Sequence, residues 1–384
     1  MFDIQCYNAI SEKGLSLLSP EQYKLDTTNP DAILVRSHKL HDMTVSPKLK
    51  AIARAGAGTN NIPVERLQSL GIPVFNTPGA NANAVKELVI AALLLASRNV
   101  CTAWQQTITL QGEDIDVQVE QLKKQFAGTE LPGKKIGVIG LGAIGVLVAN
   151  ATLALGMEVI AYDPHITVKN AWQLSSQVQH AQSLDEMLEA LDFVTVHVPF
   201  TPQTQHLLNR ELLQKLPNHC TVLNFARGEI IDSQAIIELL QQKKLRYYVT
   251  DFPKNELLVC PNVIPLPHLG ASTAEAEDSC AVMAVENLKA YLEFGNINYS
   301  VNFPSASLGK PKGSRLTITN KNIPNMVGQI SSELAKHQLN IIDMLNKSKQ
   351  DIAYNIIDVE GEIPSSLIEQ LSNIEGVLKC RQVC

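Results

Sequence analysis

The sequence predicts an α/β protein with two doubly wound parallel-sheet domains and a smaller C-terminal βαββαβ domain. Short runs rich in Val and Ile alternate with helix-length segments through most of the chain, which is typical of parallel strands covered by helices on both faces. A glycine-rich turn with G-x-G-x-x-G spacing opens the second such series. Residues 303–313, which are rich in Pro, Gly and Ser, are expected to be a linker to the final domain.

The first domain is predicted from four apolar runs and from a later helix that returns to it. Its expected strands are FDIQCY, AILVR, KAIARAG and PVFNT. Residues 281–294 are expected to form a helix that brings the chain back to this domain. We therefore expect the first domain to comprise residues 1–85 and 281–302.

The second domain is expected over residues 86–280. An apolar helix over residues 85–98 leads into it, and a polar stretch, residues 111–135, ends in a Pro-Gly turn that is expected to mark a boundary. Its strands are predicted at KIGVI, EVIAY, FVTVHV, TVLNF, RYYVTD and VIPLP, with helices between them.

Residues 314–384 are expected to form the third domain. RLTIT, NIIDML, IAYNIIDVEG and VLKCRQV are typical of strands, and NMVGQISSELAKHQ and SSLIEQLSN are typical of helices. Their order is βαββαβ, which predicts a ferredoxin-like sandwich.

Composition excludes several classes of protein. A net charge of −6 and a pI near 5.9 argue against a general nucleic-acid or anionic-membrane surface. The longest apolar run, residues 88–96, is far shorter than the ~20 residues that a bilayer span needs, and the first residues do not resemble a secretory signal. The cysteines stand singly without metal-ligand spacing, which fits a reducing cytoplasm and predicts no metal site. They are Cys6, Cys101, Cys220, Cys260, Cys280, Cys380 and Cys384.

The glycine-rich turn predicts a dinucleotide site. Gly140, Gly142 and Gly145 follow the strand KIGVI and precede a helix, so a pyrophosphate can approach the backbone at the positive end of that helix. Asp163 ends the next strand, about 20 residues after the glycines, where a carboxylate accepts hydrogen bonds from the adenosine ribose. Because a carboxylate there repels a 2′-phosphate, the expected cofactor is NAD rather than NADP.

Three ionisable residues follow predicted strands of the same sheet. Arg227, Glu256 and His268 come after TVLNFA, VTDFPKN and VIPLP, at the strand ends where doubly wound folds hold ligands. Taken singly, they also suit a structural ion pair, a solvated loop residue and a buried histidine. Together they suit oxidation of a 2-hydroxy acid, with histidine as general base, a carboxylate that fixes its tautomer, and arginine to bind the substrate carboxylate.

The chain resembles the D-2-hydroxyacid dehydrogenase family. RAGAGTNNIPVERLQSLGIPVFNTPGANANAVKEL, GKKIGVIGLGAIG, LNFARGEIID and LPHLGAST carry the resemblance, which spans essentially the whole chain. Within the family, the chain is similar to members that oxidise 3-phospho-D-glycerate, the first step of serine synthesis, and that carry a C-terminal ACT domain. The resemblance implies a substrate domain, a Rossmann NAD domain and an ACT-like regulatory domain.

The resemblance also implies roles for individual residues. Arg227, Glu256 and His268 match the family's catalytic set, and Asp251 matches the residue that contacts the nicotinamide carboxamide. On the substrate side, it implies carboxylate binding by the loop at Ala57 and Gly58, a polar contact from Asn81, and phosphate binding by Arg36 and Arg54. The other cofactor-contact positions that it implies are Ala143, Ile144, Val198, Ala226 and Gly270.

Regulation and assembly are further expectations from the resemblance. Asn322 and Asn340 match positions that contact an amino-acid effector, which implies serine, but Asn325 stands where the family usually has glycine. Lys123 and Lys124 resemble a basic segment that reaches a neighbouring subunit, and a dimer or tetramer is expected. Surface ion pairs for the two arginines of the first domain, and solvated charges for the two lysines, remain alternatives.

Two other functions are consistent with parts of the sequence. Another D-2-hydroxyacid dehydrogenase, acting on hydroxypyruvate, glycerate or D-lactate, would use the same catalytic set but would leave Arg36, Arg54 and the C-terminal domain without a role. A non-catalytic NAD-sensing scaffold, similar to the carboxy-terminal binding protein corepressors, would also retain that set.

Overall fold

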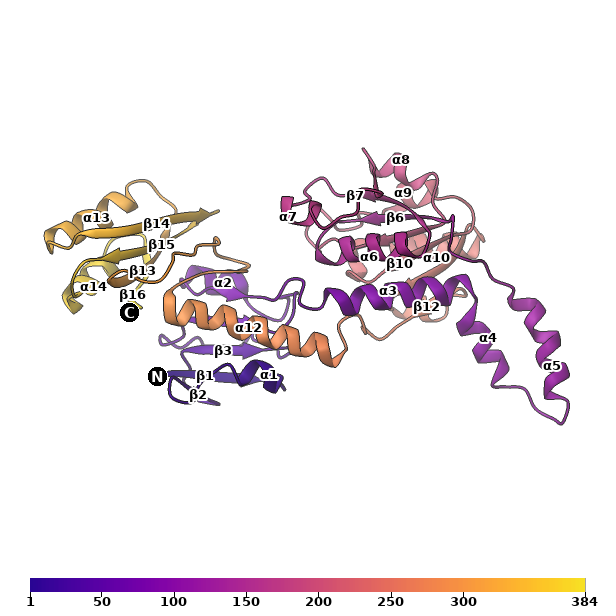
Figure 1. Ribbon diagram of the computed structural model, residues 1–384, viewed down its shortest axis with the longest axis horizontal. Helices are drawn as coiled ribbons and strands as arrows, with labels where there is room; N and C mark the ends of the chain where they lie inside the picture. Colours follow the sequence, from indigo (N-terminus) through magenta and orange to yellow (C-terminus); the bar gives the residue numbers. More distant parts are fainter. Residues whose placement is uncertain (384) are drawn as a thin grey trace. The chain divides into compact units, whose positions relative to one another are not determined.

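The computed structural model describes residues 1–383, so the expectation for Cys384 lies outside the described residues. The chain forms two compact units (Figure 1). The first unit consists of residues 1–81 and 274–384, and the second consists of residues 82–273. The second unit begins with helix α3 (Ala82–Ser97), and helix α12 (Ala274–Phe294) brings the chain back to the first unit.

The N-terminal part of the first unit is a five-stranded parallel sheet in the order β2-β1-β3-β4-β5. Successive residues of β3 enter different cores: Leu34 packs toward α12, whereas Ile33 and Val35 pack in a second cluster on the other face. Both faces are therefore covered, which explains the continuous apolar strands. The elements are β1 (Phe2–Tyr7), α1 (Glu12–Leu15), β2 (Tyr23–Leu25), β3 (Ala32–Val35), β4 (Ala51–Arg54), α2 (Val64–Ser69) and β5 (Val74–Phe75).

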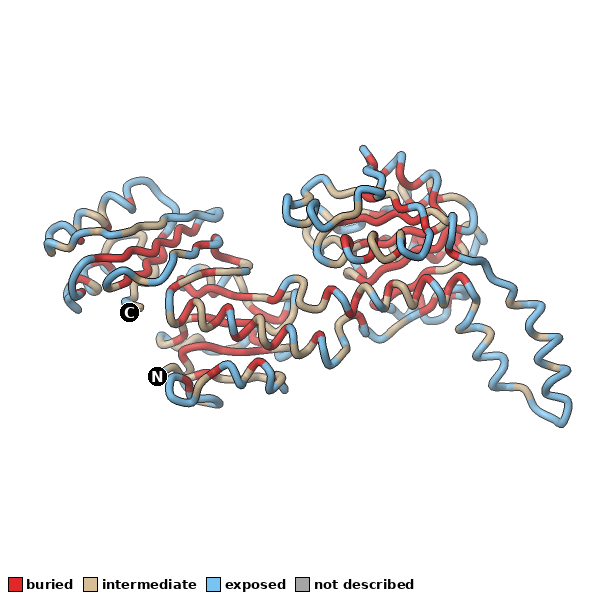
Figure 2. The backbone as a smooth tube through the Cα atoms, in the orientation of Figure 1, coloured by how far each residue is buried: buried red, intermediate tan, exposed pale blue. Residues whose placement is uncertain are grey.

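The C-terminal part of the same unit is an antiparallel sheet in the order β14-β15-β13-β16, with the predicted βαββαβ connectivity. Every residue of β15 is buried (Figure 2). Ile357 and Val359 pack into the core that this sheet forms with its own helices, whereas Tyr354 and Ile356 join the core that contains α12. The elements are β13 (Ser314–Lys321), α13 (Met326–Lys336), β14 (Ile341–Lys349), β15 (Ile352–Val359), α14 (Ser365–Ser372) and β16 (Val377–Gln382).

The second unit holds a seven-stranded parallel sheet in the order β12-β11-β10-β9-β6-β7-β8. The strand order reverses between β6 and β9, and such a switch point opens a crevice at the carboxyl ends of the strands. The strands are β6 (Lys135–Ile139), β7 (Glu158–Tyr162), β8 (Gln179–His180), β9 (Phe193–Val196), β10 (Cys220–Asn224), β11 (Leu245–Thr250) and β12 (Val263–Pro265). The predicted fold class is thus confirmed for all three sheets.

Helices cover both faces of this sheet. They include α3, α6 (Ala143–Ala154), α7 (Val168–Ala171), α8 (Leu184–Leu188), α9 (Arg210–Lys215), α10 (Ser233–Gln241) and α11 (Asn255–Leu258), with a 3₁₀ turn, η2 (Gly228–Ile230). No helix within residues 1–383 is long and apolar enough to cross a membrane. Within the same range, no group of side chains forms a metal site and the cysteines that are described are free thiols.

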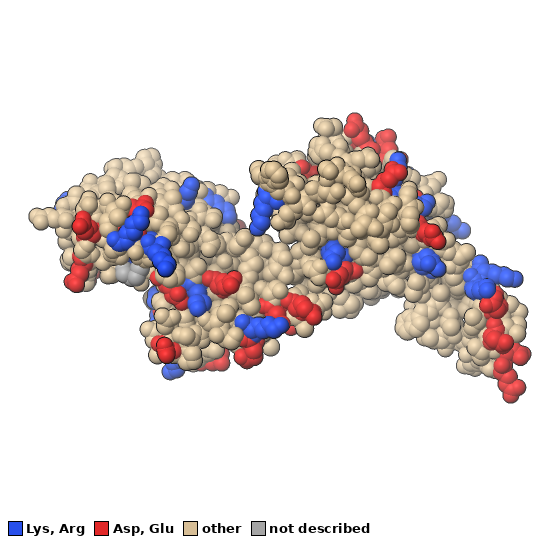
Figure 3. Space-filling view, in the orientation of Figure 1, with Lys and Arg blue, Asp and Glu red and all other residues tan. Residues whose placement is uncertain are grey.

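A helical arm projects from the second unit and departs from our prediction (Figure 1). It consists of α4 (Val100–Thr107), α5 (Ile115–Leu122) and η1 (Lys123–Phe126), and neither α4 nor α5 has a buried residue (Figure 2). The polar stretch over residues 111–135 therefore lies within the second unit and is not a boundary between units. Acidic side chains gather along one edge of the arm, and elsewhere charges of both signs are interspersed over the visible surface (Figure 3).

Candidate active site

The glycine-rich turn between β6 and α6 has the geometry of a phosphate-binding turn. Gly140 has a φ of +92°, and a Cβ there would meet the His197 carbonyl oxygen at 2.8 Å. A Cβ on Gly145 would lie 1.9 Å from the Gly140 carbonyl oxygen, so this glycine lets the helix pack on the turn. At Gly142, by contrast, a Cβ would have no heavy atom within 4 Å among residues 1–383, so open space adjoins the turn.

The N-terminus of α6 is open to an anion. Gly142 is its N-cap residue and supplies no side-chain cap, so the first amides, including those of Ala143 and Ile144, remain available. Val198 borders the same turn, because its Cγ1 lies 2.8 Å from the position of a Cβ on Gly140. These features fit a pyrophosphate at the switch point of the sheet.

Asp163 is held against this turn at the end of β7. One carboxylate oxygen accepts a hydrogen bond from the Leu141 amide at 2.7 Å, and the other accepts one from the His165 amide at 2.8 Å. Each oxygen keeps acceptor capacity for a ribose hydroxyl. The carboxylate is therefore oriented by the backbone, as a ribose-binding group requires.

The arginine in LNFARGEII is placed by a buried asparagine. Asn224 ends β10 with no exposed surface; its Nδ2 donates to the Arg227 carbonyl at 2.9 Å, and its Oδ1 accepts from the Ala226 amide at 3.1 Å. These bonds turn the chain sharply after the strand, and the Arg227 guanidinium donates to the Ala226 carbonyl at 2.6 Å. Burial lowers the pKa of Arg227, and nearby Glu229 opposes this change.

Phe252 lies between the predicted base and the predicted cation. Its ring is 4.8 Å from the His268 ring, centroid to centroid, and 5.8 Å from the Arg227 guanidinium carbon. Gly228 permits this approach, because a Cβ there would lie 3.2 Å from the Phe252 Cβ. The structure thus brings Arg227 and His268 together around one aromatic ring.

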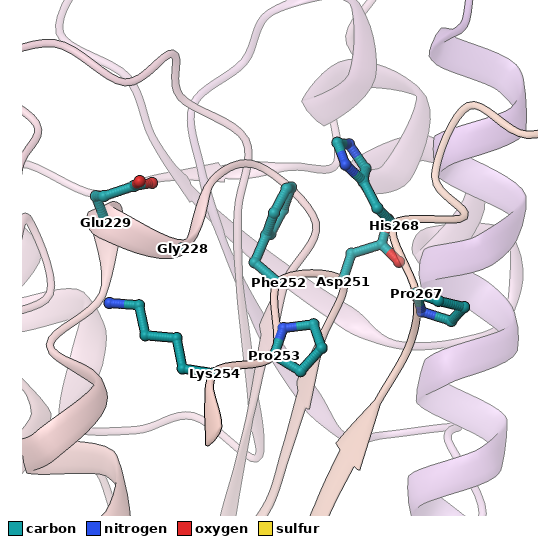
Figure 4. Close-up of a pocket in the computed structure, with 8 residues that line it drawn as sticks. All are labelled: Gly228, Glu229, Asp251, Phe252, Pro253, Lys254, Pro267 and His268. Carbon is teal, nitrogen blue, oxygen red and sulfur yellow. The ribbon is translucent and has the colours of Figure 1, made fainter. Parts of the chain in front are cut away.

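A cavity of about 400 Å³ opens beside this ring (Figure 4). In the figure, His268 stands on one side of Phe252, whereas Glu229 and Lys254 lie on the other side. The remaining lining comes from Gly228, Asp251, Pro253 and Pro267. A small ligand in this cavity would meet an imidazole, an ammonium group and a carboxylate.

Asp251 positions the loop that carries His268. It is 1% exposed, and its two carboxylate oxygens accept hydrogen bonds from the Leu269 amide at 2.8 Å and the Gly270 amide at 2.7 Å. His268 itself has a φ of +57°, in the left-handed region that non-glycine residues adopt only when their surroundings require it. The buried Asp251 carboxylate imposes this conformation, because it holds the amides of the next two residues, Leu269 and Gly270.

Glu256 occupies a different position from the other two catalytic candidates. It lies in the first turn of α11 and is exposed, and the cavity lining reaches Lys254 but does not include it. The predicted bond between its carboxylate and the His268 ring therefore stays a prediction.

In the first unit, the two predicted phosphate-binding arginines lie side by side at the ends of β3 and β4. The Arg54 Nε donates to the Arg36 carbonyl at 2.9 Å, and its Nη1 donates to the Gly58 carbonyl. Arg36 pairs with Glu277 in the first turn of α12. Both partners of that pair are substantially exposed, so it contributes only about 0–1 kcal/mol and leaves the guanidinium able to exchange partners.

The loop after β4 presents polar groups that fit an anion. Gly56 has a φ of +154°, and among residues 1–383 the amides of Ala57 and Gly58 donate to no other group. Asn81 has a buried Oδ1 without a hydrogen-bond partner in the same range. A buried acceptor without a hydrogen bond destabilises the folded protein, unless a ligand or a water molecule donates a hydrogen bond to it.

The two predicted effector residues do not meet within one chain. The Asn322 Nδ2 donates to the Gln350 carbonyl at 3.0 Å, and the Asn340 Nδ2 donates to a Glu360 carboxylate oxygen at 3.3 Å. These partners flank opposite ends of β15. Asn325 has a φ of +67°, so this asparagine adopts the left-handed conformation that the family's glycine would have there.

Two residues that build the site were absent from our predictions. Phe252 reads as an ordinary apolar residue after Asp251, and Asn224 reads as a polar interruption of a strand. The second offers a usable signal, because an asparagine inside a fully buried strand must find hydrogen-bond partners in the adjoining turn.

Comparison with known proteins identifies the second unit. Residues 90–270 match the model of the D-isomer specific 2-hydroxyacid dehydrogenase, NAD binding domain. The cofactor of this domain is NAD, and the geometry of the glycine-rich turn and of Asp163 is suited to binding it.

Several similar proteins are named D-3-phosphoglycerate dehydrogenase, among them relatives from Methanocaldococcus jannaschii and Haemophilus influenzae. The one from Methanocaldococcus jannaschii is 35% identical over 352 residues, which cover 87% of this chain and 64% of the relative, so the chain spans less than two thirds of its length. The one from Haemophilus influenzae is 33% identical over 360 residues, covering 90% of this chain and 84% of the relative. A hydroxypyruvate reductase from Thermotoga maritima is 39% identical over 256 residues, covering 64% and 78%.

Solved structures share the fold. The NAD⁺-bound 3-phosphoglycerate dehydrogenase of Entamoeba histolytica is 25% identical, with a TM-score of 0.62, and the match covers 78% of this chain and 98% of that one. The apo D-lactate dehydrogenase of Escherichia coli is also 25% identical, with a TM-score of 0.61, over 78% and 99% of the two chains.

Proposed function

Because the chain belongs to the D-isomer specific 2-hydroxyacid dehydrogenase family, we propose that it oxidises 3-phospho-D-glycerate to 3-phosphohydroxypyruvate with NAD, the first step of serine synthesis. The observation that carries the proposal is the cluster around Phe252, where an imidazole and a guanidinium meet at the carboxyl ends of strands next to a dinucleotide turn. The names of several relatives, D-3-phosphoglycerate dehydrogenase, support the substrate.

In this proposal, His268 removes the proton from the substrate hydroxyl. Its ring faces an open cavity, and imidazole ordinarily titrates near neutral pH, as a general base should. Glu256 holds the other ring nitrogen and fixes the tautomer. NAD supplies hydride-accepting chemistry when it is bound by the glycine-rich turn, Asp163 and the nearby strand ends.

Arg227 binds the substrate carboxylate and polarises the oxygen that becomes the ketone. Its planar fork grips a carboxylate by two bonds, and its charge persists at neutral pH. In the first unit, Arg36 and Arg54 bind the phosphate, while the amides of Ala57 and Gly58 and the Asn81 side chain bind the carboxylate end. The short β4 loop and the unpartnered Asn81 oxygen support that part of the proposal.

Substitution of the base tests the catalytic assignment. We expect His268→Asn to lower kcat by about 10²–10⁴-fold, because a positioned general base contributes that much, while the Kd for NADH stays within twofold. His206→Asn is the matched control, since His206 is another exposed histidine with positive φ in the same unit. A His268→Asn enzyme with near-wild-type kcat would remove histidine from the mechanism.

Substitution of Arg36 tests the substrate assignment. Arg36→Ala is expected to lower kcat/KM for 3-phospho-D-glycerate at least tenfold more than for D-glycerate, because only the former has a phosphate to lose contact with. Equal losses on both acids would contradict phosphate binding by Arg36.

The second candidate is hydroxypyruvate or glycerate turnover. The Thermotoga maritima relative, named hydroxypyruvate reductase, is 39% identical over 256 residues and favours this alternative. Comparison of phosphorylated and unphosphorylated acids as substrates distinguishes the two.

We further propose that the protein is a homo-oligomer and that serine inhibits it. Exposed apolar residues on the helical arm support association, and Lys123, which pairs with Glu120 there, would approach the neighbouring copy. Asn322 and Asn340 lie at opposite ends of one sheet, so an effector site that uses both requires two copies. A serine titration that leaves activity unchanged and gives no binding heat would refute inhibition.

A further inference from the structure

A second cavity, of about 920 Å³, lies within the first unit, and none of its lining residues belongs to the candidate active site. One wall is the segment after α12, residues 298–305, and the other is the end of β14, residues 347–349. These segments are distant in sequence, so the cavity exists only because the C-terminal sheet packs on the end of the N-terminal part of the unit.

The wall on β14 carries two lysines that face the same way. Lys347 and Lys349 are two residues apart on a strand, so their side chains point to one face, and both line the cavity. The described lining contains no carboxylate. Two positive charges therefore enter this cavity without neutralisation by its lining.

Lys349 is held in place by the opposite wall. Its Nζ donates to the Ser300 carbonyl at 3.4 Å and to the Val301 carbonyl at 2.9 Å, which leaves a third N–H for a ligand. Burial lowers the pKa of Lys349, so an anion beside it would restore charge stabilisation that the amine lost on folding.

Two aromatic residues, Tyr299 and Phe303, line the cavity. Phe303 is 1% exposed and meets Tyr354 at a ring distance of 6.0 Å, and the Tyr354 hydroxyl donates to the Gly295 carbonyl at 2.7 Å. Tyr299 is 48% exposed and has a φ of +52°. The lining thus offers an exposed aromatic ring to the carbon skeleton of a ligand, in the same cavity as the two lysines.

We propose that this cavity is a binding site for a small organic anion with a phosphate or a second carboxylate group. The anionic group contacts Lys347 and the remaining donor of Lys349, and the rest of the ligand lies along Tyr299. Free phosphorylated metabolites and di- or tricarboxylates share this chemistry, and O-phospho-L-serine and citrate represent the two sources in the test.

The test is calorimetric titration of the full-length protein with each probe at low ionic strength, together with hydrogen–deuterium exchange. We expect saturable binding of at least one probe, with slower exchange in residues 298–305 and 345–350. Lys347→Gln is expected to weaken binding about fivefold or more, and Lys310→Gln, an exposed linker lysine outside the lining, is expected to bind as the wild type does.

Two results would overturn the proposal. One is the lack of saturable heat with either probe in the wild-type protein. The other is binding that Lys347→Gln leaves unchanged, which would place the anion elsewhere. Because Lys347 has no part in the proposed chemistry, NADH formation by Lys347→Gln remains a separate test of the dehydrogenase proposal.

Discussion

Asp251 decides where the His268 loop lies. Both of its oxygens accept backbone amides of the two residues after His268, and the carboxylate is 1% exposed. The resemblance to the family gave this residue a contact with the cofactor. The geometry gives it a positioning task as well, because the left-handed conformation of His268 depends on where Leu269 and Gly270 are held.

Replacement of Asp251 separates positioning from stability. Asp251→Asn sets an amide NH₂ against a backbone N–H, which costs about 1–3 kcal/mol and displaces the loop. We expect kcat to fall about 10–100-fold. Asp232→Asn is the matched control, because Asp232 also accepts two backbone amides, at the start of α10, away from the cavity. An equal loss of kcat in both variants would show that Asp251 stabilises the fold in general and does not position His268 in particular.

His197 gives a pH dependence of stability. Burial lowers its pKa from 6.5 to about 3, while Nε2 bonds to Thr195 and Nδ1 has no partner among residues 1–383. Between pH 6.5 and 3 the unfolded chain binds a proton that the folded chain does not, so stability is lost as pH falls through this window. Relative to His197→Gln, the wild type should lose up to about 1.4 kcal/mol per pH unit, measured by urea unfolding. Parallel pH profiles would contradict this account.

Single residues could be predicted from the sequence where their residue type is unusual for the surrounding segment. Arg227 was predicted because a cation lies beside an apolar, buried strand. Gly140, Gly142 and Gly145 were predicted from their G-x-G-x-x-G spacing. Phe252 was not predicted, because an apolar residue after a strand is ordinary and its role arises only when β10, β11 and β12 lie together.

At the level of secondary structure, the C-terminal end of α12 is where the C-terminal sheet attaches to the rest of the first unit. The C-terminal sheet covers carbonyls at the end of this helix, because Arg315 donates to Phe294 at 3.1 Å and Arg381 donates to Tyr291. Tyr354 donates to the carbonyl of Gly295, the residue after the helix. Two guanidinium groups thus meet the negative end of the helix dipole. The C-terminal sheet is therefore fixed to this helix by its second face.

Arg315 is the buried centre of this junction. It is fully buried and bonds twice to Asp358, at 2.6 and 2.8 Å. Removal of one partner of a buried ion pair leaves the other uncompensated, so Arg315→Met should lower the free energy of unfolding by about 3–5 kcal/mol. Lys336→Met, which breaks an exposed pair with Glu333, should change it by less than about 1 kcal/mol. Urea unfolding measures both changes. If Arg315→Met lowered the free energy of unfolding as little as Lys336→Met does, the stabilising role of Arg315 would be contradicted.

The helical arm tests the proposed assembly. Trp104 on α4 and Ile108, the residue that caps the C-terminus of this helix, are four residues apart and are 63% and 65% exposed. A surface of this kind is stable when another chain covers it. We expect wild-type protein to be a dimer or larger by light scattering, and Trp104→Asp to shift it toward monomer, whereas Gln105→Asp on the same helix should not. A wild-type monomer would refute the assembly.

The sequence predicted elements best where a core enforces a period. Residues 2–7 and 32–35 form strands as expected, whereas the short β2 was missed because YKL has no apolar pattern. Residues 111–135, which include part of the arm, were expected to mark a boundary because they are polar and end in a Pro-Gly turn, but they lie within the second unit.

On the scale of the whole molecule, the three sheets were predictable because two faces of each parallel sheet must be covered and because βαββαβ order has one common solution. The sequence did not predict that the C-terminal sheet would share a core with α12. That core depends on the alternation of β15, in which Tyr354 and Ile357 serve opposite faces.

The central claim, that this chain oxidises 3-phospho-D-glycerate with NAD, is tested most directly by initial-rate NADH formation. The substrates are 3-phospho-D-glycerate, D-glycerate and D-lactate, with hydrazine present to trap the keto product. We predict a kcat/KM at least about 10²-fold higher for the phosphorylated acid, since a bidentate arginine–phosphate contact adds several kcal/mol. Comparable rates on all three acids would make the chain a general hydroxyacid dehydrogenase, and no rate with tight NADH binding would favour a sensing scaffold; either result would contradict the claim.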